Sequence, residues 1–259
     1  MLETKDSVCK LAPYCKKAGK QGYCNALCSP FLLLHGEGEG GLWKATNVPP
    51  KYKSSFFSNL PIQADNPVPY SMVKRYTGNI LENVQNGVGL FFYSIPNGEN
   101  RLGTGTGKTT TAVAILHEYL LARIKEQSRG GRVIETNPAL FYKASEFQTL
   151  YNSQFRGTFE MQEKASLRYY KVKALLMKAE MLVLDDIGIR QKITDAFENE
   201  LTEIIDARDS KMLMTIYTSN LPLEKLGDTL GDRIASRIEG MTEQVAFKGK
   251  DHRKGGVLS

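Results

Sequence analysis

The second half of the chain alternates short apolar runs with longer amphipathic segments. Residues 88–94, 181–184 and 212–218 are apolar and aromatic runs of strand length, and 132–135 and 245–247 are shorter candidates. Uninterrupted runs of this length are typical of strands buried on both faces of a sheet. The pattern therefore predicts five short, buried strands.

Helical periodicity fills the gaps between these runs. One helix is predicted over 109–124, and a second is opened by the capping-box spacing of Ser145 and Gln148. A third precedes the strand at 212–218. Alternation of this kind implies an α/β fold in which a parallel sheet lies between helices. The apolar positions that mark the three helices are Val113, Leu116, Leu120 and Ile124; Phe147 and Leu150; and Phe197, Leu201, Ile204 and Ile205.

The first third of the chain has a different composition. Residues 1–40 contain all the cysteines and are too short to bury a core without a metal, and the stretch from Gly36 to Gly41 is typical of a flexible linker. Residues 41–69 are rich in Pro, Asn and Ser, which predicts an extended lead-in that packs on the next domain. We therefore expect a module over 1–40, a linker and lead-in over 41–69, and an α/β domain over 70–259.

Composition narrows the setting in which the protein works. The chain has 259 residues, a net charge of +6 and no apolar run near the roughly 20 residues that a membrane helix needs. No apolar segment follows a basic start, so we expect no secretory signal, no membrane partner and a cytoplasmic location. The basic charge is compatible with a nucleic-acid partner but does not demonstrate one.

The cysteines are clustered near the N-terminus, at Cys9, Cys15, Cys24 and Cys28. In a reducing cytosol such clustering favours a metal over disulfides, and four thiolates complete the tetrahedral shell of a structural zinc site. The spacing is not that of paired CxxC motifs, so four reduced, unliganded cysteines are an alternative. His35 is a further possible ligand in place of one cysteine.

The first predicted strand leads into a loop rich in Gly and Thr, and a predicted helix follows at once. Glycines let backbone N–H groups turn inward around phosphates, and the helix N-terminus adds its positive dipole end. We expect Lys108 to reach the β- and γ-phosphates of ATP and the Thr109 hydroxyl to bind Mg²⁺. Leu102 stands where the usual pattern has its first glycine, and residues 96–101 lengthen the loop. The predicted nucleotide-binding residues are Gly103, Thr104, Gly105, Thr106, Gly107, Lys108, Thr109, Thr110 and Asp185.

Two acidic residues follow the run at 181–184. At the end of a buried strand the first of such a pair lies beside the metal and the second beside the attacking water. We therefore assign Asp185 to Mg²⁺ and Asp186 to the general base, where a longer glutamate is usual. Asn220 follows the next strand and can hydrogen-bond the attacking water or the γ-phosphate, although Asn before Leu-Pro is also a common turn residue.

These motifs occur in one order along the chain. Strand, P-loop and helix are followed by Leu-Asp-Asp-Ile-Gly, Tyr-Thr-Ser-Asn-Leu-Pro and Gly-Asp-Arg-Ile-Ala-Ser-Arg. Together they resemble the AAA+ ATPases of the DnaC/DnaI helicase-loader family over about residues 45–259. The cysteine module loosely resembles the zinc-binding N-terminal domain of the DnaI branch. The resemblance implies a P-loop AAA+ domain with a five-stranded parallel sheet and without the C-terminal helical lid of most AAA+ proteins.

The resemblance also implies roles for late arginines. In the family an arginine of the Asp-Arg-x-x-x-Arg segment acts on the nucleotide of the neighbouring subunit, and it maps to Arg237, with Arg233 next in line. Arg253 maps to the sensor-2 arginine. A guanidinium suits these roles because it offers a fork of donors to a γ-phosphate and keeps its charge. From the sequence alone, each arginine could equally pair with a surface acid.

Basic and aromatic residues are interleaved between 143 and 173. Cations neutralise phosphates and aromatic rings stack on exposed bases, so this composition suits single-stranded DNA. The alternative is two amphipathic helices with their aromatics in the core and their lysines in solvent. The resemblance, which implies single-stranded DNA in the ring, favours DNA. The residues concerned are Lys143, Arg156, Lys164, Arg168, Lys171 and Lys173, with Phe147, Tyr151, Phe155, Tyr169 and Tyr170.

The resemblance implies a loader of a replicative DnaB-type helicase hexamer. Its N-terminal module would bind the helicase, and its AAA+ domain would bind ATP, self-associate into a ring or spiral, and hydrolyse ATP weakly with an arginine from the next subunit. One alternative is a transposition helper ATPase of the IstB type, which shares most of these motifs. Another is an adaptor that binds nucleotide and never hydrolyses it.

Overall fold

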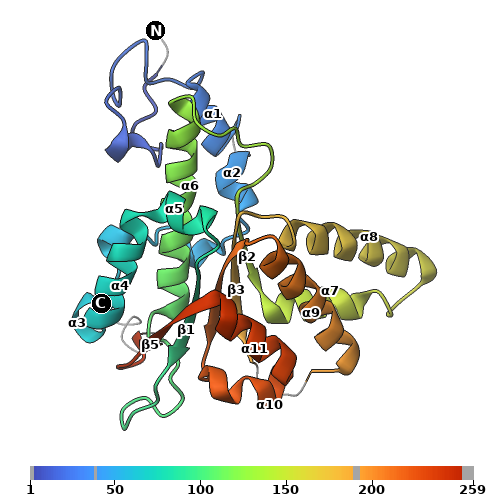
Figure 1. Cartoon of the computed structure of the whole chain (residues 1–259). Helices are drawn as coiled ribbons and strands as arrows, with labels where there is room; N and C mark the ends of the chain where they lie inside the picture. Colours follow the sequence, from blue (N-terminus) through green and yellow to red (C-terminus); the bar gives the residue numbers. More distant parts are fainter. Residues whose placement is uncertain (1–2, 38–39, 189–192, 253–259) are drawn as a thin grey trace, which may run out of the picture.

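The computed structural model describes residues 3–37, 40–188 and 193–252. Five strands form an all-parallel sheet in the order β2-β3-β4-β1-β5 (Figure 1). The predicted α/β fold with a five-stranded parallel sheet is therefore confirmed. The strands are β1 (Gly89–Ser94), β2 (Ala139–Lys143), β3 (Met181–Ile187), β4 (Met214–Ser219) and β5 (Thr242–Phe247).

Both faces of the sheet are buried, which explains the uninterrupted apolar runs. Successive strand residues point to opposite faces, so Leu90 and Phe92 join one apolar cluster while Phe91 joins the other. In β3, Val183 and Leu184 divide in the same way. The sheet is thus the middle layer of three.

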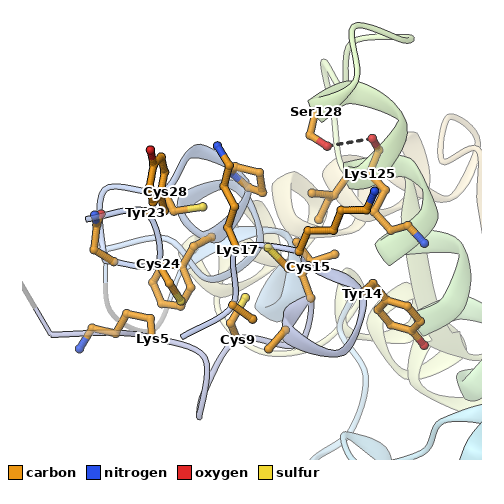
Figure 2. Close-up of a pocket in the computed structure, with 18 of the residues that line it drawn as sticks. Lys5, Cys9, Tyr14, Cys15, Lys17, Tyr23, Cys24, Cys28, Lys125 and Ser128 are labelled. Atoms are coloured by element: carbon orange, nitrogen blue, oxygen red, sulfur yellow. Dashed lines mark hydrogen bonds between the residues drawn. The ribbon is translucent and has the colours of Figure 1, made fainter. Parts of the chain in front are cut away.

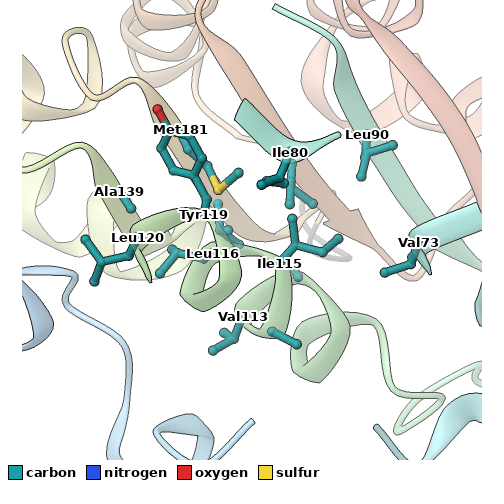
Figure 3. Packing of buried hydrophobic residues seen from close by; sticks show 14 of the residues in the cluster. Val73, Ile80, Leu90, Val113, Ile115, Leu116, Tyr119, Leu120, Ala139 and Met181 are labelled. Carbon is teal, nitrogen blue, oxygen red and sulfur yellow. The ribbon is translucent and has the colours of Figure 1, made fainter. Parts of the chain in front are cut away.

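Helices cover the two faces unequally. The longest, α6, lies on one face with α4 and α5, and Figure 3 shows its residues Ile115 and Leu116 among the buried side chains there. The other face is covered by α7, α8, α9 and α11. The helices of the domain are α4 (Pro67–Gly78), α5 (Ile80–Gln85), α6 (Lys108–Ser128), α7 (Ala144–Ser153), α8 (Phe159–Leu176), α9 (Asp195–Ser210), α10 (Gly227–Leu230) and α11 (Asp232–Met241).

Two predictions about local structure were wrong. Residues 132–135 are not a strand, because the Arg123 guanidinium donates to the carbonyls of Arg132 and Val133, and Val133 is 69% exposed. The strand in this part of the chain is β2, which begins at Ala139. The capping box is also absent, because α7 begins at Ala144, before Ser145, and its N-cap residue makes no side-chain hydrogen bond.

The lead-in is helical rather than extended. It forms the short helices α2 (Gly41–Ala45) and α3 (Ile62–Asp65), with 3₁₀ turns over Pro50–Tyr52 and Phe57–Asn59. Its packing on the domain agrees with the prediction, since the backbone N–H of Phe141 in β2 donates to the Thr46 carbonyl. The lead-in therefore seals the outer edge of the sheet beside β2.

The N-terminal module packs on the C-terminal half of α6. It contains a 3₁₀ turn (Ala12–Tyr14) and one helix, α1 (Ser29–His35), and its buried Leu11 and Leu34 belong to the same apolar cluster as α6. The Tyr14 hydroxyl lies 3.4 Å from Glu118 of α6. Among the described residues, no helix has the length and apolar character needed to cross a membrane.

Candidate functional site

The P-loop connects the end of β1 to the start of α6. Gly107 immediately precedes α6 with φ of 96°, and a Cβ there would lie 2.4 Å from the Ile62 side chain. Gly105 has φ of 65°, and a Cβ there would collide with the Asp251 carboxylate. Both positions require glycine because a side chain would meet a left-handed backbone and an occupied space. The loop therefore has the tight backbone curvature of a phosphate cradle.

Lys108 occupies the first residue of α6 and is 7% exposed. Its ammonium donates to the Ser94 hydroxyl at 2.5 Å, to the Gly103 carbonyl at 3.2 Å and to the Asn220 amide oxygen at 2.9 Å. These contacts hold the cation inside the loop, where a terminal phosphate would meet it. Ser94 was not predicted, although its position as the last residue of the strand before the loop is a usable signal.

The two predicted magnesium residues lie in contact. The Thr109 hydroxyl donates to Asp185 Oδ1 at 2.7 Å, and the Thr218 hydroxyl of β4 donates to the same oxygen at 2.7 Å. Asp185 is 4% exposed, and burial raises the pKa of its carboxyl while the two hydroxyls oppose that rise. A hydroxyl and a carboxylate side by side are the hard oxygen ligands that Mg²⁺ prefers, so these residues fit the metal.

Asp186 and Asn220 form the outer part of the site. Asp186 sits in a β-bulge with φ of 58°, its side chain is exposed, and its backbone N–H donates to the Thr218 hydroxyl at 2.9 Å. The Asn220 amide nitrogen lies 3.5 Å from Asp186 while its oxygen accepts from Lys108. Asn220 therefore joins the lysine to the second acid, and the bulge turns Asp186 away from Asp185.

The predicted arginines are not at this site within the chain. Arg237 and Arg233 lie on α11, and both pair with Asp206 of α9; Arg237 also donates to Asp209 at 3.1 Å. Their partners are surface acids, the alternative left open by the sequence. Arg253 lies outside the described residues.

The four cysteines line one pocket of about 510 Å³ between the N-terminal module and the end of α6 (Figure 2). Burial raises the pKa of the Cys9 thiol, with smaller contributions from Cys28 and Cys24. Within the described ranges, no three His, Cys, Asp or Glu side chains are grouped closely enough to hold a metal ion. His35 accepts a hydrogen bond from the Lys10 backbone. Thiols are the right chemical type of ligand for zinc, but the four sulfur atoms are too far apart in this structure to bind one ion together.

The interleaved basic and aromatic residues divide into two sets. Phe147 and Tyr169 are buried in the core, and Lys173 is buried and pairs with Glu200 and Glu203. Tyr151 packs among these rings, and Lys143 pairs with Glu146. The exposed set lies on α8 and the turn before it, and comprises Phe155, Arg156, Lys164, Arg168, Tyr170 and Lys171. The prediction therefore mixed core residues with surface residues.

Comparison with known proteins places this geometry in a fold. Residues 155–254, less than half of the chain, match the family model of IstB-like ATP binding proteins, and no curated protein matches. The chain is similar to the DnaC helicase loader at 22% identity, with a TM-score of 0.55, covering 77% of this chain and 100% of that one. The fold is that of a P-loop AAA+ domain.

Two further structures share the AAA+ fold. One is DnaI, at 19% identity and a TM-score of 0.55, covering 78% of this chain and 95% of that one. The other is the replication initiator DnaA bound to AMPPCP and single-stranded DNA, at 22% identity and a TM-score of 0.53, covering 79% of this chain and 52% of that one. In the present chain the P-loop, Lys108 and the acids after β3 lie at the carboxyl ends of the parallel strands, where ligands bind in open α/β sheets.

Proposed function

We propose that this protein is an ATP-dependent loader of a replicative DnaB-type helicase hexamer. The observation that carries the proposal is the contact network Lys108–Asn220–Asp186 beside Thr109–Asp185 on an AAA+ fold similar to that of DnaC and DnaI. These residues come from the P-loop and the start of α6, from β3 and from the residue after β4, and they supply a cation, a metal-binding pair and a polar group at one place. That set suits binding and hydrolysis of ATP.

Each residue has a role that follows from its position. Lys108 holds the β- and γ-phosphates, and the backbone N–H groups after Gly105 bind their oxygens. Thr109 and Asp185 hold Mg²⁺, which neutralises charge on the phosphates when it is bound. Asp186 accepts the proton of the attacking water, and Asn220 orients that water because its amide already lies between Lys108 and Asp186. The inline attack needs a further cation on the γ-phosphate.

That cation is Arg237 of a neighbouring subunit, with Arg233 next to it and Arg253 as the sensor-2 residue. Arg237 has no place at its own P-loop, since its guanidinium pairs with Asp206 and Asp209 on α9. Its side chain is 35% exposed, so it lies within reach of another chain. A lone protomer is then a weak ATPase, and self-association into a ring or spiral completes the site.

The N-terminal module would bind the helicase, stabilised by zinc on Cys9, Cys15, Cys24 and Cys28. Two observations support this: the four thiols line one pocket, and the module contributes little to the apolar core, with Leu11 and Leu34 as its buried hydrophobic side chains among the described residues. A structural zinc ion contributes folding free energy directly in modules of this size. Zinc binding would draw the thiols together from their present positions.

Single-stranded DNA would bind the exposed set on α8. Phe155, in the turn before α8, and Tyr170 on α8 are 66% and 63% exposed, and Arg168 and Lys171 are exposed on the same helix. Exposed rings offer stacking surfaces to bases while the cations neutralise phosphates. Bound DNA and bound ATP would then together control opening of the helicase ring.

A second candidate is a transposition helper ATPase, favoured by the match of residues 155–254 to the IstB-like family. The two functions differ in partner. The test is capture of purified DnaB-type helicase or of a transposase by the full-length protein, with ATP present. Retention of the helicase, weakened in Cys24→Ser and kept in the exposed-site control Lys20→Ser, supports the loader; retention of the transposase alone overturns it. Loss of Mg²⁺-dependent ATPase activity in Lys108→Ala would exclude a non-hydrolysing adaptor.

A further inference from the structure

The P-loop lacks the first glycine of the usual pattern, and the side chain of another residue holds the loop backbone instead. Leu102 stands at that position and is 56% exposed, so its side chain does not stabilise the loop. The inserted segment before it turns back on itself, with Asn97 and Asn100 exchanging two backbone hydrogen bonds of 3.2 Å. The turn delivers Asn100 to the interior, where it is 6% exposed, although it belongs to a loop.

The Asn100 side chain is saturated with hydrogen bonds. Its amide nitrogen donates to the Thr104 carbonyl at 2.7 Å and to the Gly249 carbonyl at 3.2 Å, and its oxygen accepts from the Thr104 backbone N–H at 3.3 Å. Both backbone groups of Thr104 are therefore bound by one side chain. A buried amide with both donors and its acceptor in use is a strong constraint on the backbone.

Thr104 is the residue at which the phosphate cradle begins. With its carbonyl and N–H held by Asn100, the peptide that joins Thr104 to Gly105 has a fixed orientation, and in the proposed site the N–H groups from Gly105 onward would bind the phosphates. The second donor bond, to Gly249, ties the same point to the segment that leaves β5. That segment contacts the loop again, because the His252 N–H donates to the Gly105 carbonyl at 3.1 Å.

We propose that Asn100 is a positioning residue of the nucleotide site, which orients Thr104 and the P-loop backbone in place of the missing glycine. The proposal rests on the proposed function, in that the loop must bind ATP. Asn100 does not touch the phosphates; it acts through the Thr104 peptide. Its contribution belongs to nucleotide affinity, since Asp186 and Asn220, which are proposed to act on the attacking water, belong to β3 and to the residue after β4.

The test is the Kd of Mg-ATP for the full chain in wild type, Asn100→Asp and Glu99→Gln. The Asn100→Asp variant has the same shape and keeps the acceptor, but at pH 8 it presents a charged oxygen to two carbonyls in place of the donors. We expect the Kd to rise about tenfold or more, as the loss of two buried hydrogen bonds implies, and kcat at saturating ATP to change little. Glu99→Gln, in the same turn and exposed, should bind as wild type does.

A pH profile separates positioning from loss of fold. Burial against two carbonyls should raise the pKa of the carboxyl introduced by Asn100→Asp, and once protonated it regains a donor for the Thr104 carbonyl, so the ratio of variant to wild-type Kd should shrink as pH falls from 8 to 5.5. An Asn100→Asp protein with wild-type Kd at pH 8, or with a ratio that does not change with pH, overturns the proposal. Lys108→Ala distinguishes failure of the proposed function from failure of the inference about Asn100. If it binds ATP as well as wild type does, the proposed function fails and this inference with it; if it loses ATP while Asn100→Asp keeps it, only this inference fails.

Discussion

The Thr109 hydroxyl and the Asp185 carboxylate are 2.7 Å apart, across the gap between α6 and β3. The contact joins the P-loop helix to the strand that carries the acids. Thr218 holds the same oxygen from the other side, so Asp185 has little freedom to move. The two residues proposed to hold Mg²⁺ are thus fixed by hydrogen bonds, and burial of the Asp185 carboxylate lowers the stability of the fold by an amount that can be measured.

Asp185→Asn should stabilise the protein while it removes Mg²⁺-dependent ATPase activity. The pKa of Asp185 is raised by burial, so the folded protein holds this proton more tightly than the unfolded chain does. The charged carboxyl therefore costs stability as pH rises from the ordinary carboxyl pKa through the raised pKa of Asp185 in the fold. We expect a gain of about 1 kcal/mol in the free energy of unfolding at pH 7. Chemical denaturation measures it, with Glu163→Gln, at an exposed position of α8, as control; equal stabilities for all three proteins would contradict the argument.

Arg237→Ala and Lys108→Ala should complement each other. Each variant alone lacks one half of an inter-subunit site, but a mixed assembly contains some interfaces with an intact P-loop facing an intact arginine. We expect each to lose at least about a hundredfold in ATPase rate, since an arginine supplied in trans contributes on the order of 10³ or more. Equimolar mixing should restore activity well above the sum of the two. An additive result would place Arg237 outside the site.

Tyr170→Ala should weaken binding of single-stranded DNA about tenfold, the effect of losing one base-stacking surface. Tyr23→Ala is the matched control, because Tyr23 is 60% exposed on the N-terminal module and Tyr170 is 63% exposed on α8. Fluorescence anisotropy with a labelled oligothymidine measures both. Equal affinities for the two variants would remove α8 from the DNA surface.

His117 should make the fold sensitive to acid. The ring is buried against Trp43 and Phe56, and burial lowers its pKa to about 4, although the Nδ1–H that donates to the Ser55 carbonyl at 2.8 Å opposes this shift. The unfolded chain binds this proton from about pH 6.5, which means that stability is lost as pH falls from 6.5 to 4. The loss should reach up to about 3 kcal/mol.

Denaturation midpoints across that window measure the effect. His117→Phe cannot take up the proton, so its stability should fall less steeply with acid than that of wild type, although its value at pH 7 drops through loss of the Ser55 contact. Parallel pH profiles for the two proteins would assign the acid sensitivity to other groups.

Removing zinc should unfold the N-terminal module and leave the AAA+ domain intact. A strong chelator is expected to release about one zinc ion per chain, detected by elemental analysis, and to increase proteolysis within residues 3–37. ATP affinity should change little, because the cysteine pocket lies at the far end of α6 from the P-loop. Absence of zinc in protein purified without chelators would leave the cysteines as reduced thiols.

The sequence was informative where chemistry depends on neighbours along the chain. Lys108 and Thr109 followed from the P-loop pattern, and Asp185 from the end of an apolar run. Ser94 and Thr218 were missed because their roles arise from pairing of β1, β3 and β4, which no local pattern specifies.

The errors have the same origin. Val133 and Ile134 suit a strand, but the carbonyls there are taken by Arg123 from the preceding helix. Phe147 and Tyr169 suited DNA as well as a core, and only the packing of α7 against α8 assigns them to the core. Tertiary contacts decided each case, as they often override local preference.

The helix α6 has a mechanical consequence. Its first residue, Lys108, is in the P-loop, and its last turns, with Lys125 and Ser128, line the cysteine pocket about 30 Å away, at 1.5 Å of rise for each of its 21 residues. An uninterrupted helix that is packed along its length is a rigid element. The P-loop and the N-terminal module are thus fixed to the two ends of one continuous helix, whose length sets the separation between them.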